Sequence, residues 1–335
     1  MQKLYILFLC TYTMLTQGTD QLATGAEKLT RSISAHIARS KQRRQILSGH
    51  TSVVSCAIMP NPTTICSSSW DKTVRIWDAT SGQTNHILNA HTAPVNQVIQ
   101  AMDHTIASAS SDTTVRIWDI ETGQCEQVLG AAAYVRSLAY KESKLAIGAD
   151  NIIYLCDPRN PSSNIGHLQH ARTVTCLWHP TSTTLISGSL DGTLREWDIR
   201  QYKKPPIHVY KVQREIYGLA GSYPYAAAGT EGTNLHIVDI KKSTSTPLSI
   251  KEVHHTYALD FLNEQTLIFA GEKDRQPVLC VINTGTSAQQ PVTTDHTDLI
   301  ASVHYIPATD SLISASKDTT IHVQRDFQAK LDQMQ

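Results

Sequence analysis

Histidine, serine and aspartate recur in this chain at fixed distances from a Trp-Asp pair. His50, His91 and His170 each stand 27 residues before the tryptophan of such a pair. An aspartate stands six residues before each of these tryptophans, with serines just ahead of it. Serine, histidine and aspartate held together can act as a nucleophilic triad, which is hydrolase chemistry. The aspartates and tryptophans concerned are Asp71 and Trp77, Asp112 and Trp118, and Asp191 and Trp197.

The repetition of this set argues against catalysis. Each copy lacks an oxyanion-stabilising feature beside it, so we expect these polar side chains to satisfy one another inside a sheet. The sequence has no G-x-G-x-x-G, Walker-type, H-E-x-x-H or G-x-S-x-G motif. His254 and His255 are adjacent, and neighbouring strand residues point to opposite faces. We therefore predict a protein that is not an enzyme, with no catalytic residue, no metal site and no cofactor.

The amino-acid composition excludes further classes of protein. Of 335 residues, 41% are hydrophobic and 17% charged, with 29 basic and 29 acidic side chains. Such a chain can bury a core, and its balanced charge argues against a nucleic-acid binder. No apolar run reaches the roughly 20 residues of a membrane span. The seven cysteines include no C-x-x-C pair, so we expect small buried hydrophobic side chains; a disulfide framework is the alternative if the chain is exported.

An internal repeat organises most of the chain. Anchored on the tryptophan position, successive units are separated by 41, 38, 41, 41, 44 and 42 residues. Short apolar-alternating runs lie between turn residues in each unit, which favours β-strands. Seven sheets of about 40 residues packed around an axis can bury faces that one sheet alone would expose. The anchors are Trp77, Trp118, Cys156, Trp197, Val238, Ile282 and Gln324.

The repeats resemble the WD40 family. The segments SGHTSVVSCAIMPNPTTICSSSWDKTVRIWD and SASSDTTVRIWDIETGQ carry the resemblance, which covers residues 42–326. It implies an all-β, seven-bladed WD40 β-propeller. The polar residues after residue 326 predict a polar tail at 327–335. The resemblance also implies that each His, Ser, Asp and Trp set is a structural hydrogen-bonded tetrad; Asp150 is the member kept in the third unit. We expect residues 43–47 to complete the seventh blade and close the ring, because an open ring would expose two strand edges.

The resemblance also predicts a binding surface at the central mouth of the propeller. In the family, the residue before each tetrad Asp and two positions on the innermost strand point there. Aromatic and arginine side chains at such positions are typical of binding hot spots. In the alternative interpretation, Trp70 folds over its own blade and the tyrosines fill packing positions. The predicted partner-binding residues are Trp70, Tyr134, Arg136, Tyr217, Tyr257 and Lys317.

We therefore predict a non-enzymatic scaffold that binds other proteins, as a monomeric propeller within a complex. One alternative is a substrate receptor of a cullin-RING ubiquitin ligase. Cys156-Asp-Pro-Arg159 and Trp197-Asp-Ile-Arg200 end neighbouring units and resemble the Trp-Asp-x-Arg box of such receptors, in which Arg159 and Arg200 would contact the adaptor. The other alternative, a propeller enzyme or sugar-binding module, would need a polar, ion-binding channel, of which the sequence gives no sign.

The N-terminal residues allow two predictions for the cellular compartment of the protein, secretory or cytoplasmic. Residues 1–18 have a basic residue, a short apolar core and a small-residue exit, as in a secretory signal peptide. The alternative is an apolar leader packed on a cytoplasmic protein, the usual setting of the fold. In residues 19–41, apolar side chains recur every three or four positions, which predicts a basic amphipathic helix. An exported protein could not serve a cytoplasmic ligase, so these two hypotheses compete.

Overall fold

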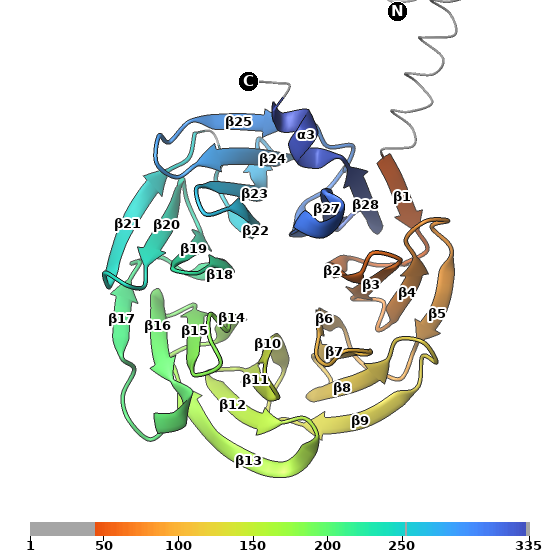
Figure 1. Ribbon diagram of the computed structural model, residues 1–335, viewed down its shortest axis with the longest axis vertical. Helices are drawn as coiled ribbons and strands as arrows, with labels where there is room; N and C mark the ends of the chain where they lie inside the picture. Colours follow the sequence, from red (N-terminus) through yellow and green to blue (C-terminus); the bar gives the residue numbers. More distant parts are fainter. Residues whose placement is uncertain (1–43, 252, 333–335) are drawn as a thin grey trace, which may run out of the picture. The chain divides into compact units, whose positions relative to one another are not determined.

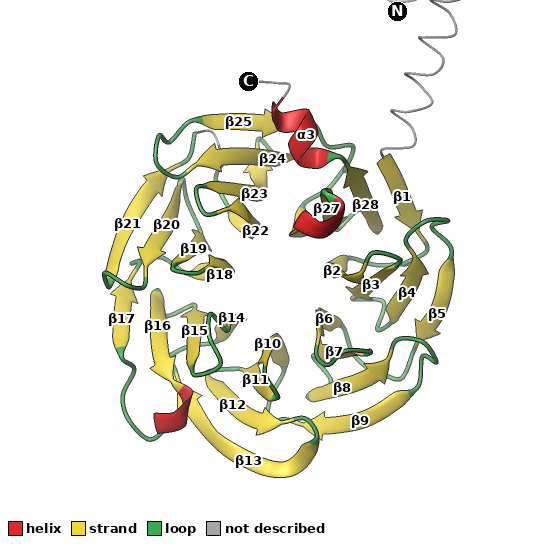
Figure 2. Ribbon diagram, viewed as in Figure 1, coloured by secondary structure: helices red, strands yellow, loops and turns green. Residues whose placement is uncertain are grey.

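Seven four-stranded antiparallel sheets, here called blades 1 to 7, surround a central axis (Figure 1). The computed structural model describes residues 44–251 and 253–332; the predicted leader at 1–18 and helix at 19–41 lie outside them. Within the described residues, strands and turns make up nearly the whole ring (Figure 2). The seven-bladed propeller predicted from the repeat is confirmed.

In blades 1 to 6 the four strands follow one another in chain order from the axis outward. Blade 1 contains β2 (Val54–Asn61), β3 (Thr64–Ser69), β4 (Val74–Asp78) and β5 (Thr84–Leu88). Blade 2 contains β6 (Val95–Gln100), β7 (Thr105–Ser110), β8 (Thr114–Asp119) and β9 (Cys125–Gly130). Blade 3 contains β10 (Val135–Lys141), β11 (Lys144–Ala149), β12 (Ile152–Asp157) and β13 (Asn160–Gln169).

The second half of the ring repeats this order. Blade 4 contains β14 (Val174–Trp178), β15 (Thr184–Ser189), β16 (Thr193–Asp198) and β17 (His208–Lys211), with the 3-10 turn η1 (Ile199–Gln201) between the last two. Blade 5 contains β18 (Ile216–Ser222), β19 (Tyr225–Thr230), β20 (Asn234–Asp239) and β21 (Thr244–Ser249). Blade 6 contains β22 (Thr256–Asn263), β23 (Thr266–Lys273), β24 (Gln276–Asn283) and β25 (Gln289–Val292).

Blade 7 joins the two ends of the ring. Its strands β26 (Ile300–Ile306), β27 (Ser311–Ser316) and β28 (Thr320–Arg325) come from the end of the chain, and η2 (Pro307–Thr309) lies between the first two. Its outermost strand is β1 (Arg44–Ser48), which pairs with β28 as the sequence predicts. Leu47 packs with residues of blades 1 and 7 in one apolar cluster, so closure buries side chains as well as pairing main chains.

The second strand of each blade shows why small residues are needed inside the ring. All six residues of β7 and of β27 are buried, because neighbouring blades cover both faces of a blade. Alanine and serine in β7 let the adjacent blade approach closely. The segment expected to be a polar tail begins with a helix, α3 (Phe327–Asp332), whose Phe327 and Leu331 are buried against blades 6 and 7.

Candidate functional site: the mouth of the propeller

The His, Ser, Asp and Trp side chains of blade 1 form one hydrogen-bonded chain. Trp77 Nε1 donates to Ser67 Oγ (2.8 Å), and Ser67 Oγ pairs with His50 Nε2 (2.8 Å). On the other side of the His50 imidazole, the Nδ1 atom lies 2.7 Å from Asp71 Oδ2. Of the two candidate serines, Ser67 takes this place, while Ser69 Oγ accepts from the backbone N–H of Asp71.

Blades 2 and 4 repeat the network with the same atoms. His91 bonds Ser108 and Asp112 at 2.8 and 2.7 Å, and His170 bonds Ser187 and Asp191 at 2.7 and 3.0 Å. Burial lowers the pKa of His170 to about 4, against the opposing effect of Asp191. The neutral ring fits a chain in which Nδ1–H donates to the carboxylate and Nε2 accepts from serine. Trp118 and Trp197 donate to their serines at 2.8 Å, so every polar atom of the network has a structural partner.

Blade 7 keeps the histidine and aspartate and replaces the aromatic part. His296 bonds Ser314 (2.9 Å) and Asp318 (2.8 Å), and His322 stacks on it with ring centroids 3.7 Å apart and planes 10° apart. The ligand atoms of His296, Asp318 and His322 lie within 4.8 Å of one another. A metal binds in the plane of an imidazole, which two parallel stacked rings cannot both offer to one ion. In this structure both ring nitrogens of His296 are engaged by Asp318 and Ser314, and His322 Nε2 lies 3.2 Å from the Thr320 hydroxyl.

In blade 3 the turn that leads to the third strand is one residue shorter than in blade 1. The backbone N–H of Asp150 bonds the carbonyl of Tyr134, as that of Trp70 bonds Val53. Asp150 therefore stands at the position of Trp70, and its carboxylate accepts from the Thr173 hydroxyl at 3.1 Å. Our expectation that Asp150 is a remaining tetrad aspartate is wrong, because counting back from Cys156 ignored the shorter turn.

A β-bulge at the start of the innermost strand places one side chain of each blade at the mouth. The register of all seven inner strands shifts there, and the shift leaves one residue without a paired residue on the next strand. Bulges re-aim side chains, and all seven bulged residues line one hollow of about 310 Å³. They are Ser55, Asn96, Arg136, Thr175, Tyr217, Tyr257 and Ala301.

The bulged residues do two different things. Ser55, Asn96 and Thr175 each donate a hydrogen bond of 2.7 Å to a carbonyl on the first strand of the following blade. These three side chains act as latches between neighbouring blades. Arg136 and Tyr257 stand at the same position of their own blades, but the described structure shows no such bond from their side chains.

The structure places five of the six predicted partner-binding residues around this hollow. Trp70 and Lys317 line it from the turns of blades 1 and 7, and Arg136, Tyr217 and Tyr257 are bulged residues. Trp70 is 48% exposed, so about half of its surface faces solvent. The sixth residue, Tyr134, is 64% exposed and is not among the lining residues.

The two tyrosines are held close together. Gly218 follows Tyr217, and a Cβ there would collide with the carbonyl oxygen of Tyr257. Glycine therefore lets β18 approach β22, and the rings of Tyr217 and Tyr257 lie edge to face with centroids 5.5 Å apart. Tyr217 donates to Glu215 (2.6 Å), a hydrogen bond that raises the pKa of Tyr217 to about 12, and Arg172 pairs with Glu215 at 2.7 Å. The ring contact and the Tyr217–Glu215–Arg172 bonds thus fix the position of the Tyr217 side chain at the mouth.

Comparison with known proteins agrees with the fold. The family model "WD domain, G-beta repeat" matches residues 41–78, 82–119 and 162–198, the segments that end at the Trp-Asp pairs. The chain is a WD40 propeller.

Named relatives match only segments of this WD40 propeller. It is 31% identical over 161 residues to "Ribosome biogenesis protein WDR12 homolog" of Arabidopsis thaliana, covering 46% of this chain and 28% of that protein. It is 31% identical over 102 residues to "Protein SPA1-RELATED 3" of the same plant, covering 28% of this chain and 12% of that protein. The matches thus span less than a third of the length of these relatives.

The predicted adaptor-contacting arginines of the WD40 propeller share one geometry. Arg159 forms a two-pronged ion pair with Asp157 at the end of β12, with Nε and Nη2 distances of 3.0 and 2.7 Å. Arg200 repeats it with Asp198 at the end of β16, at 2.9 and 2.8 Å. The equivalent Asp78 and Asp119 instead accept from their own turns. Both arginine side chains are exposed on neighbouring blades.

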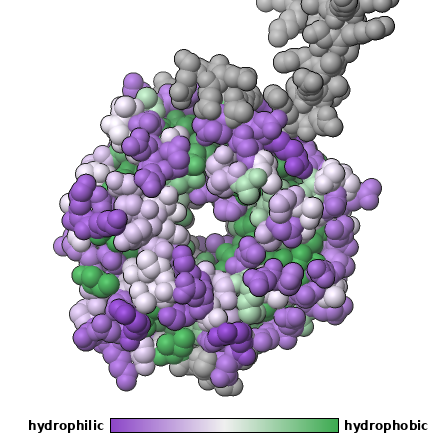
Figure 3. All heavy atoms as spheres, viewed as in Figure 1, coloured by the Kyte–Doolittle hydropathy of each residue, from purple (hydrophilic) through white to green (hydrophobic). Residues whose placement is uncertain are grey.

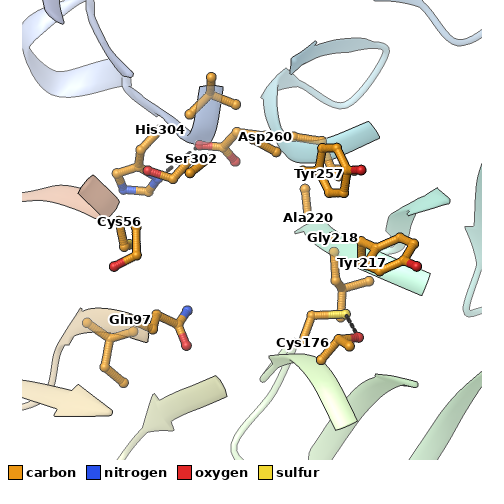
Figure 4. Close-up of a pocket in the computed structure, with 18 of the residues that line it drawn as sticks. Cys56, Gln97, Cys176, Tyr217, Gly218, Ala220, Tyr257, Asp260, Ser302 and His304 are labelled. Carbon is orange, nitrogen blue, oxygen red and sulfur yellow. Dashed lines mark hydrogen bonds and ion pairs between the residues drawn. The ribbon is translucent and has the colours of Figure 1, made fainter. Parts of the chain in front are cut away.

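Below the mouth, the WD40 propeller has an open axis (Figure 3). A channel of about 440 Å³ shares Arg136, Tyr217 and Tyr257 with the hollow. It is also lined by inner-strand residues that the sequence analysis did not assign to a site, including Cys56, Gln97 and His304 (Figure 4). His304 Nδ1 lies 3.0 Å from Asp260 Oδ2. Burial opposes a charge on His304, but the bond to Asp260 and its charge prevail and raise the pKa of His304. No repeat spacing or residue type in the sequence indicated that Cys56, Gln97 and His304 line the channel.

The described residues also bear on the predictions about disulfides and membrane spans. Cys56, Cys66, Cys125, Cys156, Cys176 and Cys280 are all free thiols, so no disulfide links them. Burial raises the pKa of Cys176 to about 12, as expected of a thiol that packs rather than reacts. In the part of the chain that the structure describes, no helix has the length and apolar character needed to cross a bilayer.

Proposed function

We propose that this WD40 propeller is a non-enzymatic interaction module that holds a segment of a partner protein in its mouth. One observation carries the proposal: residues from all seven blades, far apart in sequence, converge on one hollow of about 310 Å³. A rigid scaffold that presents exposed aromatic and cationic side chains suits peptide recognition. The relatives' names do not narrow the partner, because the matches cover so little of those proteins.

The tetrads support the non-enzymatic part of the proposal. Their serine, histidine and aspartate atoms are bonded to one another in blades 1, 2 and 4, and the histidine and serine are buried. A nucleophile must reach its substrate, and these hydroxyls lie between strands.

The test is to replace Trp70 by alanine and to measure binding of peptides selected on the wild-type protein from a phage library of random peptides. We expect at least a tenfold loss of affinity, the usual size of a hot-spot truncation, with an unchanged melting temperature. Ile207→Ala is the matched control, since Ile207 is also a large exposed apolar side chain (59% against 48% for Trp70) but lies beside β17. Equal losses in both variants, or a large drop in melting temperature for Trp70→Ala, would contradict the proposal.

A second candidate function is that of a substrate receptor for a cullin-RING ligase. The paired Asp-Arg forks at the ends of β12 and β16 favour it, because they fix two exposed guanidinium groups in the same geometry on adjacent blades. Co-purification with the ligase adaptor tests this candidate. Capture that disappears in the Arg159→Ala, Arg200→Ala double variant supports it, and absence of the adaptor from wild-type complexes rejects it.

A further inference from the structure

Some cations near the mouth are paired with carboxylates, whereas in the described structure Arg136 and Lys317 are not. Arg172 pairs with Glu215 and Arg195 with Asp191. Arg136 and Lys317 are exposed, and among the residues that the structure describes neither side chain has a hydrogen-bond or ion-pair partner. The described residues that line the hollow include these two cations and no carboxylate.

Arg136 also lacks the side-chain hydrogen bond to the next blade that residues at the same position make in blades 1, 2 and 4. The bulged residues of blades 1, 2 and 4 latch onto the next blade through Ser55, Asn96 and Thr175. Blade 3 has the same bulge between Val135 and Ser137, with Arg136 at its centre. A long cation at a latch position contributes no interblade bond, yet it lines both the hollow and the channel below.

We propose that the mouth binds a partner segment by taking an aspartate or glutamate side chain into the hollow, against Arg136 and Lys317. A carboxylate is the ligand that two cations without partners in a partly enclosed hollow favour, since charge-assisted hydrogen bonds are the stronger kind. Trp70, at the edge of the same hollow, supplies apolar contact to the flanking residues. This inference rests on the proposed function and names the chemistry of the partner.

Carboxylates in the turns around the mouth restrict which residues can flank the acidic side chain in the partner segment. Asp150 and Glu231 occupy the turns of blades 3 and 5 that correspond to the turn of Trp70, and neither lines the hollow. Like charges near each other disfavour binding. The acidic residue of the partner is therefore expected to stand alone, with neutral or basic neighbours on that side, rather than in an acidic run.

The experiment selects peptides from a random phage library on the full chain and compares them with those selected on Arg136→Ser. Serine at this position reproduces the latch of Ser55, so the variant is expected to keep its melting temperature. We expect wild-type selections to be enriched in one aspartate or glutamate, and Arg136→Ser selections to lose that enrichment. Lys204→Ser, which removes an exposed cation after η1, is the matched control and should leave the selection unchanged.

Affinities then decide between outcomes. An enriched peptide and its Glu→Gln or Asp→Asn counterpart should differ by about tenfold or more on wild type and by much less on Arg136→Ser. Peptides that need Trp70 but show no acidic residue, or that bind Arg136→Ser equally well, overturn this inference and leave the proposed function standing. Absence of any Trp70-dependent peptide overturns both. If Arg136→Ser unfolds, Lys317→Ser provides the same comparison, since serine occupies that turn position in blade 2 as Ser111.

Discussion

Replacing Ser67 by alanine removes the hydroxyl that joins Trp77 to His50. Two buried groups lose their partner in that variant: the indole N–H of Trp77 and the Nε2 atom of His50. The equivalent change in blade 7, Ser314→Ala, affects only His296, because Gln324 stands in place of the tryptophan and makes no hydrogen bond to Ser314 in the described structure. The chain thus carries its own matched control.

The magnitude follows from the number of stranded groups. Each buried donor or acceptor left without a partner costs about 1–3 kcal/mol. Ser67→Ala is therefore expected to lower the free energy of unfolding by about 2–6 kcal/mol, and Ser314→Ala by about 1–3 kcal/mol, since two groups are affected in one case and one in the other. Urea unfolding followed by circular dichroism measures both, with stability read from the midpoint at constant slope.

The comparison can refute the reasoning. Equal losses in the two variants would mean that the tryptophan-serine bond contributes nothing, and that the tetrad is held by its histidine and aspartate alone. A loss below that of an ordinary surface substitution in both would remove the structural role from the whole network.

Two further predictions concern closure and pH. The Leu47 side chain is only 1% exposed, so Leu47→Ala should lower the free energy of unfolding by about 2–5 kcal/mol. The Ile46 side chain is 54% exposed, so Ile46→Ala should change that free energy by no more than about 0.5 kcal/mol. Equal effects would show that β1 does not close the propeller through its buried face. Burial lowers the pKa of His170 to about 4 in the folded protein, so the unfolded chain takes up a proton first as pH falls below 6.5. The free energy of unfolding should therefore decrease as the pH is lowered from 6.5 to 4, and it should decrease less steeply in His170→Gln. A urea midpoint that increases as the pH is lowered over this range would contradict the assignment.

The tetrads could be predicted because their members belong to one repeat. The spacing from His50 to Trp77 fixes which residues meet once the strands pair, and the same count applies to His91 and His170. Closure by β1 was also predictable, since a sheet lacking its outer strand leaves an edge to be covered. Blade 3 shows the limit: a turn one residue shorter moves Asp150 to the rim without changing its distance from Cys156.

The mouth was only partly predictable. Matching the inner strands identified Arg136, Tyr217 and Tyr257, but the bulge that aims them depends on strand register, which composition does not reveal. Tyr134 has the right residue type two positions earlier and does not line the hollow. The channel pair of His304 and Asp260 joins blades 7 and 6, and no spacing within one repeat could indicate a contact between two repeats.

Hydrogen exchange with and without a peptide selected on the wild-type protein tests the central claim most directly. The account predicts that protection concentrates at the mouth, in the bulge and turn segments around Trp70, Arg136 and Lys317. Protection confined to the outer strands β5, β9 and β13, or to the opposite end of the channel around Met59 and Tyr140, would show that the partner binds elsewhere on the ring.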